Sequence, residues 1–169
     1  MEKLIRFNVF QEIRKGRNDL VDAKAVVQLI FFEYKEGDFD HWKRSAYALL
    51  VCAILHTLYS GKNKSLARVH DLINMNKRYI ANILDLMLLT EHDPYGEFGW
   101  LDLKTNLPTK THPIIASVVR EFKKKDAWEL SEIFGVAYAY LQLFLDPVCA
   151  RNTCESDFGM QDLIKRIDK

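Results

Sequence analysis

Residues 46–55, Ala-Tyr-Ala-Leu-Leu-Val-Cys-Ala-Ile-Leu, decide the fold class. The run carries no charge and lies within a longer helical pattern from about His41 to Tyr59. A helix that is apolar on all sides is normally surrounded by other elements. The run is also only about half as long as a bilayer span requires. We therefore predict that it is a central, buried helix of a globular domain.

A second run of the same kind, residues 133–141, lies inside a helix that we expect from Asp126 to Leu145. Apolar residues around the two runs recur at helical spacing in shorter segments. Ser65 and the Asp146-Pro147 pair are typical helix starts. The shorter helices are expected near residues 18–34 (ending at a break near Gly37-Asp38), 65–73, 77–90, 111–122, 146–152 and from 160 onward. The fold class is all-α: a compact multi-helix domain with two buried central helices.

Two segments lack a sustained helical period. Residues 1–17 carry one short apolar motif and are expected to form an extended arm. The stretch from Glu91 to Lys110 contains Gly96, Gly99 and Pro108 and is expected to be a long surface loop. Loops of this length often carry function. The resulting organisation is an arm (1–17), an all-α domain (18–155) and a tail (156–169).

Composition and motifs argue against catalysis in this chain. The 169 residues are 49% hydrophobic and 28% charged with a formal net charge of +1, an ordinary balance for a globular protein. An odd number of cysteines, three, indicates a reducing compartment. Gly61-Lys62 is not a phosphate loop, because His56 stands where the preceding Gly is needed and Asn63 where Ser or Thr is needed. We expect no catalytic residue and no cofactor.

Metal binding is also not expected. Cys52 and His56 are one helical turn apart, but they lie in the most apolar helix, where packing is the usual role of a cysteine. Four convergent ligands cannot be named. The other cysteines, Cys149 and Cys154, lack a nucleophile motif. The remaining histidines are scattered over different elements and are expected to be surface or capping residues: His41, His70, His92 and His112.

Charge is segregated along the chain. The net charge is +3 over residues 61–90 and over 119–125, but −2 over 91–118 and −4 over 126–169. One interpretation is a surface that binds nucleic acid or an acidic partner. The other is a set of solvated helix faces and helix ends. The basic residues concerned are Lys62, Lys64, Arg68, Lys77, Arg78, Arg120, Lys123, Lys124 and Lys125.

The long loop offers a candidate protein-binding site. Tyr95, Phe98 and Trp100 stand among polar neighbours, as aromatic interface anchors often do. The alternative is that these rings fold back as a lid on the core.

Several segments together resemble one family. Arg6-Phe7-Asn8 with Glu12-Ile13-Arg14, the W-x-x-x-A-x-x-L-L pattern from Trp42, His112-Pro113, and the D-P…T-x-x-S-D-F pattern from Asp146 to Phe158 occur in the same order as in type IV secretion coupling proteins. The resemblance covers nearly the whole chain. Val9 departs from it where Pro is usual, and the 91–110 loop matches poorly.

The resemblance implies a place and a role. In that family, an all-α domain is inserted into the nucleotide-binding domain of a membrane-anchored, hexameric ATPase of conjugation and protein transport. The chain is then expected to be a non-catalytic cytoplasmic domain whose arm and tail join that ATPase domain. Its expected partners are a secretion substrate or an adaptor protein, with direct DNA binding as the alternative. The isolated domain is expected to be monomeric.

Overall fold

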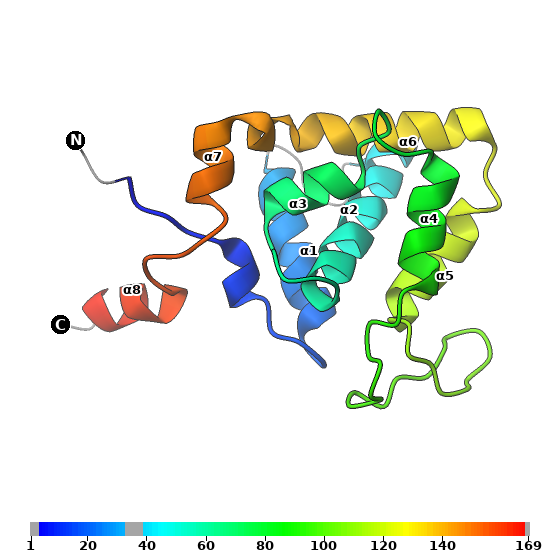
Figure 1. Ribbon diagram of the computed structural model, residues 1–169, viewed down its shortest axis with the longest axis horizontal. Coiled ribbons are helices and arrows are strands. Elements are labelled where there is room, and N and C mark those ends of the chain that lie inside the picture. Colours follow the sequence, from blue (N-terminus) through cyan, green and yellow to red (C-terminus); the bar gives the residue numbers. More distant parts are fainter. Residues whose placement is uncertain (1–3, 33–38, 168–169) are drawn as a thin grey trace.

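The computed structural model describes residues 4–32 and 39–167, and these residues form an all-α fold (Figure 1). The predicted fold class is confirmed. Within the described ranges there is one isolated bridge, between Leu101 and Pro108, and no helix is long and apolar enough to cross a membrane. The expected break at Gly37-Asp38 lies outside these ranges. The elements are η1 (Val9–Glu12), α1 (Asp19–Ile30), α2 (His41–Tyr59), α3 (Leu66–Leu72), α4 (Ile80–Leu89), α5 (Pro113–Phe122), α6 (Ala127–Tyr140), η3 (Gln142–Leu145), α7 (Pro147–Asn152) and α8 (Met160–Ile167).

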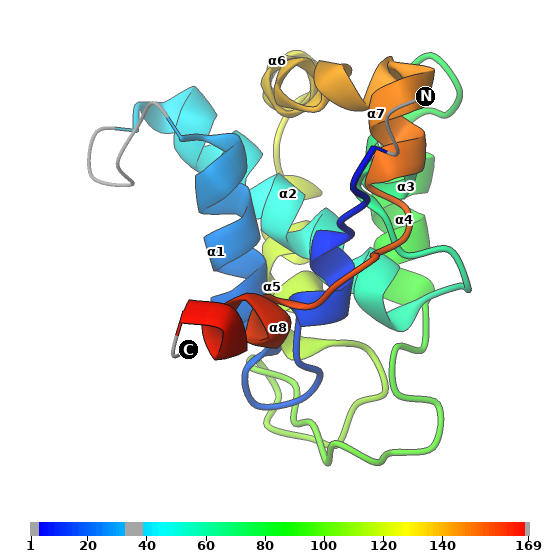
Figure 2. The same ribbon diagram turned by 90° about the vertical axis from the view of Figure 1, so that its left-hand side faces the viewer.

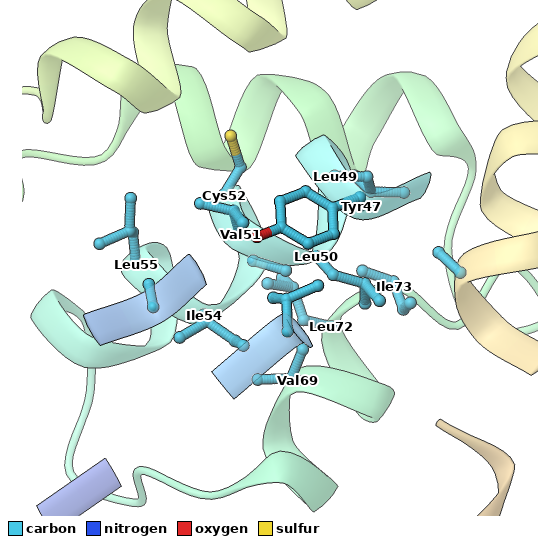
Figure 3. Packing of buried hydrophobic residues seen from close by; sticks show 14 of the residues in the cluster. Tyr47, Leu49, Leu50, Val51, Cys52, Ile54, Leu55, Val69, Leu72 and Ile73 are labelled. Carbon is cyan, nitrogen blue, oxygen red and sulfur yellow. The ribbon is translucent and has the colours of Figure 1, made fainter. Parts of the chain in front are cut away.

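Helix α2 is the centre of the domain, as its composition predicts. Its N-cap, Asp40, accepts a hydrogen bond from the Lys43 amide at 2.8 Å. Helices α1, α3, α5 and α6 all pack against it, so that its side chains are buried on every face from Ala46 to Leu58 except at Ala48. Figure 3 shows side chains of α2 beside Val69, Leu72 and Ile73, which come from α3 and its C-terminal end. Removing this apolar area from water is the main stabilising contribution to the fold.

Helix α6 differs from the expected second central helix. It ends at Tyr140, and a 3-10 turn follows. One face, with Ile133, Phe134 and Ala137, is buried against α2, whereas Trp128 is exposed. In Figure 1 the helix lies along the upper edge of the domain. An all-round apolar sequence therefore marks a true central helix in α2 but a one-sided helix in α6.

The starts of the shorter helices follow their capping residues. Ser65 accepts a hydrogen bond from the Arg68 amide, and Asp146 accepts from the first amides of α7, both as predicted. Helix α4 begins at Ile80 rather than Lys77, because residues 74–79 form a turn in which Asn74 accepts from the Lys77 amide. The N-cap of α5 is His112 rather than Thr111.

The arm packs on the domain. Phe10 and Ile13 are buried in the common core. Residues 6–8 run beside residues 152–157, and two backbone hydrogen bonds join them: Phe7 N to Asn152 O at 2.9 Å and Asp157 N to Arg6 O at 3.0 Å. Figure 2 shows the blue arm next to the orange-red segment that follows α7. Residues 6–8, which precede η1, and residues 152–157, at and after the end of α7, are therefore side by side.

Candidate functional site

Two buried carboxylates hold the loop between α4 and α5 in one shape. At its base, Asp93 accepts hydrogen bonds from the amides of Glu97 and Phe98, both at 2.8 Å, and its own amide donates to the Lys110 carbonyl. These bonds satisfy the carboxylate of a residue that is almost fully buried. They also fix a tight turn in which Gly96 has a positive φ of 69°.

Asp102 fixes the far part of the loop. It accepts from the amides of Lys104 and Thr105 and from Arg120 Nη2 of α5, the last at 2.7 Å. The Arg120 guanidinium and the two amides hold the pKa of Asp102 well below its usual value. The Asp102 amide also donates to the Leu107 carbonyl, beside the Leu101–Pro108 bridge. The loop is therefore ordered by bonds at its base and in its far part.

The three aromatic residues predicted as a partner site separate into two groups. Phe98 and Trp100 stack on each other with centroids 5.1 Å apart, and both pack edge-on against Tyr59 at the end of α2. These two rings form the lid that was the alternative interpretation. Tyr95, in contrast, is 87% exposed.

Leucines that sequence reasoning missed join Tyr95 on the exposed part of this loop. Leu103 and Leu107 are 62% and 63% exposed, and Leu101 is also exposed. We call Tyr95, Leu101, Leu103 and Leu107 the loop surface. In Figures 1 and 2 this loop projects below the helices, away from α6. One feature of the sequence could have predicted these exposed leucines: they lie in a Gly-containing segment and do not recur at helical spacing.

The basic residues of α5 and the turn after it are neutralised by acids. Arg120 pairs with Asp102, and Lys123 pairs with Asp85. Lys124 and Lys125 pair with Glu121 and Glu129, both at 2.6 Å. The positive charge predicted over residues 119–125 therefore has nearby counter-charges.

The basic residues of segment 61–78 retain an excess of positive charge. Arg68, Lys77 and Arg78 surround the single carboxylate of Asp71. Lys62 and Lys64 line an open pocket of about 700 Å³ together with Lys15. Burial and the neighbouring Lys15 lower the pKa of Lys64. We call Lys15, Lys62, Lys64, Arg68 and Arg78 the basic face.

Three histidines, His56, His92 and His112, form a buried chain. Of the two that were expected to be surface or capping residues, His112 is the N-cap of α5, whereas His92 is buried. His56 Nδ1 and His92 Nε2 are 3.0 Å apart, and the His112 amide donates to His92 Nδ1. His112 Nε2 lies 3.2 Å from Asp19 Oδ2, which also accepts from the Tyr59 hydroxyl. Burial lowers the pKa of His56 to about 4 and that of His92 to about 3, so both are neutral at pH 7. His70 is buried as well, whereas His41 is exposed.

The prediction of packing for Cys52 agrees with its environment. Its side chain is buried in the core, and burial raises the pKa of its thiol to about 12. Among the described residues, no group of three His, Cys, Asp or Glu side chains is placed to hold a metal ion.

The motif residues at the two ends of the fold meet in one clamp. The Asn8 amide donates to Ser156 Oγ at 2.8 Å, and Asn8 Nδ2 donates to the carbonyls of Lys64 and Cys154. Arg6 pairs with Asp157 and Glu155, and the rings of Phe7 and Phe158 stack at 5.3 Å. The R-F-N and S-D-F segments thus have one structural role, which is to join the arm to the segment after α7.

Fold and site together define an all-α domain that is closed by pairing of its two ends and carries a long, ordered loop. The chain matches the model of the family described as type IV secretory system conjugative DNA transfer over residues 1–168, and it belongs to that family. Two relatives, each described as conjugal transfer protein TraG of Escherichia coli, are 30% identical to it over 165 residues. The aligned part is 96% of this chain and 24% of each relative, so the chain spans about a quarter of their length. No solved structure shows a significant similarity to it.

Proposed function

We propose that this chain is the non-catalytic, cytoplasmic all-α domain of a type IV secretion coupling protein, and that it recognises a transferred protein or an adaptor through the loop surface. The observation that carries the proposal is the exposure of Tyr95, Leu103 and Leu107 on a loop that Asp93 and Asp102 hold rigid. Exposed apolar residues grouped on one segment are typical of protein interfaces.

The order of the loop favours binding. A loop that is already fixed loses little conformational entropy when a partner docks, so more of the interaction energy appears as affinity. Tyrosine and leucine side chains can then supply apolar contact area, while Glu97 and Lys104 provide a polar rim. The 91–110 loop also matches the family pattern poorly, as a specificity element would.

The clamp supports the proposed division of the chain. A domain inserted into another needs its entry and exit segments close together. The arm (1–17) and the tail (156–169) would then join the all-α domain (18–155) to the nucleotide-binding part of a membrane-anchored, hexameric ATPase. In this proposal, catalysis belongs to that part.

A binding experiment tests the loop surface. The chain would be immobilised and titrated with purified protein components of the DNA-transfer complex. Tyr95→Ser combined with Leu107→Ser is expected to weaken binding at least about tenfold, as loss of interface anchors does. The matched control is Leu29→Ser, a comparably exposed leucine on α1. Equal binding by the loop variant and the control would reject the proposal.

Direct DNA binding is the second candidate, and the basic face favours it. Its affinity would fall steeply with salt, with a slope set by the number of phosphates neutralised. Lys62→Gln with Lys64→Gln should reduce that slope by roughly two, whereas Lys124→Gln, which removes a lysine already paired with Glu121, should leave it nearly unchanged. Absence of a mobility shift at about 50 mM salt would reject this candidate.

A further inference from the structure

A small cavity lies where the C-terminal end of α2 meets α3 and α4. Its volume is about 220 Å³. The polar residues that line it are His56, Thr57, Ser60, Arg68, Arg78 and Thr90. Arg68 and Arg78 supply its charge, because Asp71, the carboxylate near both of them, is not part of the lining. The cavity is separate from the loop surface.

The hydrogen-bond chain fixes which nitrogen of His56 carries a proton. The backbone N–H of His112 donates to His92 Nδ1 at 3.2 Å, so the hydrogen of neutral His92 is on Nε2. His92 Nε2 therefore donates to His56 Nδ1 at 3.0 Å. It follows that the hydrogen of neutral His56 is on Nε2.

This His56 N–H has no acceptor in the described residues, although the side chain lines the cavity and the residue is only 6% exposed. A nitrogen that is both buried and unpaired is costly. Among the described residues, His70 Nε2 is the one side-chain nitrogen or oxygen that is sealed from solvent without a partner. His56 Nε2 is therefore not sealed from solvent, and we infer that it faces the cavity that His56 lines.

The two guanidinium groups also keep donors available. Arg68 and Arg78 approach Asp71 Oδ2 at 3.6 and 3.8 Å, longer than hydrogen bonds, and Arg78 Nη1 donates to the Asp71 carbonyl at 3.2 Å. Each guanidinium has five N–H donors, so most remain unused by Asp71. Lys77 also pairs with Asp71, which leaves the cluster two charges more positive than negative.

We propose that this cavity binds the phosphate group of a ligand, with Arg68 and Arg78 as cationic donors and His56 Nε2–H as a neutral donor from the opposite element. Guanidinium groups suit oxyanions because they combine charge with a fork of donors. The donors come from three different elements, α2, α3 and the 74–79 turn, and such a set can surround a tetrahedral oxyanion. The volume of about 220 Å³ is sufficient for a phosphate group.

Titration of the full chain with inorganic phosphate tests the site. At constant ionic strength and pH 7.5, the ¹⁵N–¹H correlations of the His56 ring should shift saturably, and calorimetry should give the dissociation constant. Arg68→Gln and Arg78→Gln should each weaken binding about tenfold, as loss of a charge-assisted bond does. The control Lys124→Gln should change it by less than about twofold. Because Arg68 and Arg78 side chains reach solvent, the variants should fold, and circular dichroism would check this.

Three results would overturn the proposal: no saturable shift of His56 up to about 20 mM phosphate, equal weakening by the control variant, or equal binding of acetate. Further arms identify the source of the phosphate. Binding of single-stranded DNA that is lost in Arg68→Gln would identify the DNA backbone, and binding of a nucleoside monophosphate without DNA binding would identify a free ligand. Both support the site. The Tyr95→Ser, Leu107→Ser variant should bind phosphate normally, so failure here is distinguishable from failure of the loop proposal.

Discussion

Asn8 is the residue whose loss should weaken the clamp most. Its side chain is buried, donates to the carbonyls of Lys64 and Cys154 at 2.7 and 3.0 Å, and accepts from the Phe10 amide at 3.0 Å. Asn8→Ala removes all three bonds and leaves two carbonyls and one N–H without a partner. An unsatisfied buried polar group costs about 1–3 kcal/mol, and water will reach some of these half-buried partners. We expect the free energy of unfolding to fall by about 3 kcal/mol.

Urea denaturation and thermal melting measure this loss. For a chain of this length, about 3 kcal/mol corresponds to a decrease in Tm of roughly 6–12 °C. The matched control is Asn63→Ala, the same side chain at an exposed position just before Lys64, which should change stability by less than about 0.5 kcal/mol. If Asn8→Ala were as stable as this control, the clamp would not hold the arm to the domain.

Two further predictions concern the histidine chain and the loop. Because the folded-state pKa values of His56 and His92 lie below the ordinary 6.5, the unfolded chain takes up protons first, and stability falls as the pH drops from about 6.5 toward 4 and 3. Urea denaturation should show that the protein is about 2–4 kcal/mol less stable at pH 5 than at pH 7. The variant His92→Gln should reduce that difference. Equal stability at the two pH values would contradict the neutral histidine chain. Asp102→Asn removes the charge that pairs with Arg120, and hydrogen exchange of the Lys104 and Thr105 amides should quicken about tenfold or more. Unchanged exchange there, with Lys124→Gln as the control, would mean that Asp102 does not order the loop.

Local signals in the sequence predicted most of the fold. The apolar run of α2 must be covered on every side, and this holds for any set of neighbouring elements. Its burial therefore follows from its own residues. The caps Ser65 and Asp146 bond to amides two or three positions away, which makes their helix starts predictable. For α6 the same reasoning predicted the wrong environment. An apolar sequence shows that a helix can be buried, but it does not show whether another element packs against its outer face.

Long-range pairings could not be predicted in the same way. The histidine chain joins α2 to residues 92 and 112, and Arg120 reaches Asp102 from a different element. These partners are separated by between 18 and 36 positions, and no spacing rule links them. For this reason the basic residues of 119–125 looked like a charged surface in the sequence, although they are paired in the structure. The aromatic lid is a similar case, since nothing local distinguishes Phe98 from Tyr95.

The most direct test of the account is photo-crosslinking from the loop surface during DNA transfer. A photoreactive amino acid would replace Tyr95 in the proposed full-length coupling protein, and a second variant would carry it at Leu29 as the exposed control. We predict a crosslink from position 95, and not from position 29, to a protein component of the transferred complex or an adaptor. Crosslinking that is absent from position 95, or equal from both positions, would contradict recognition by this loop.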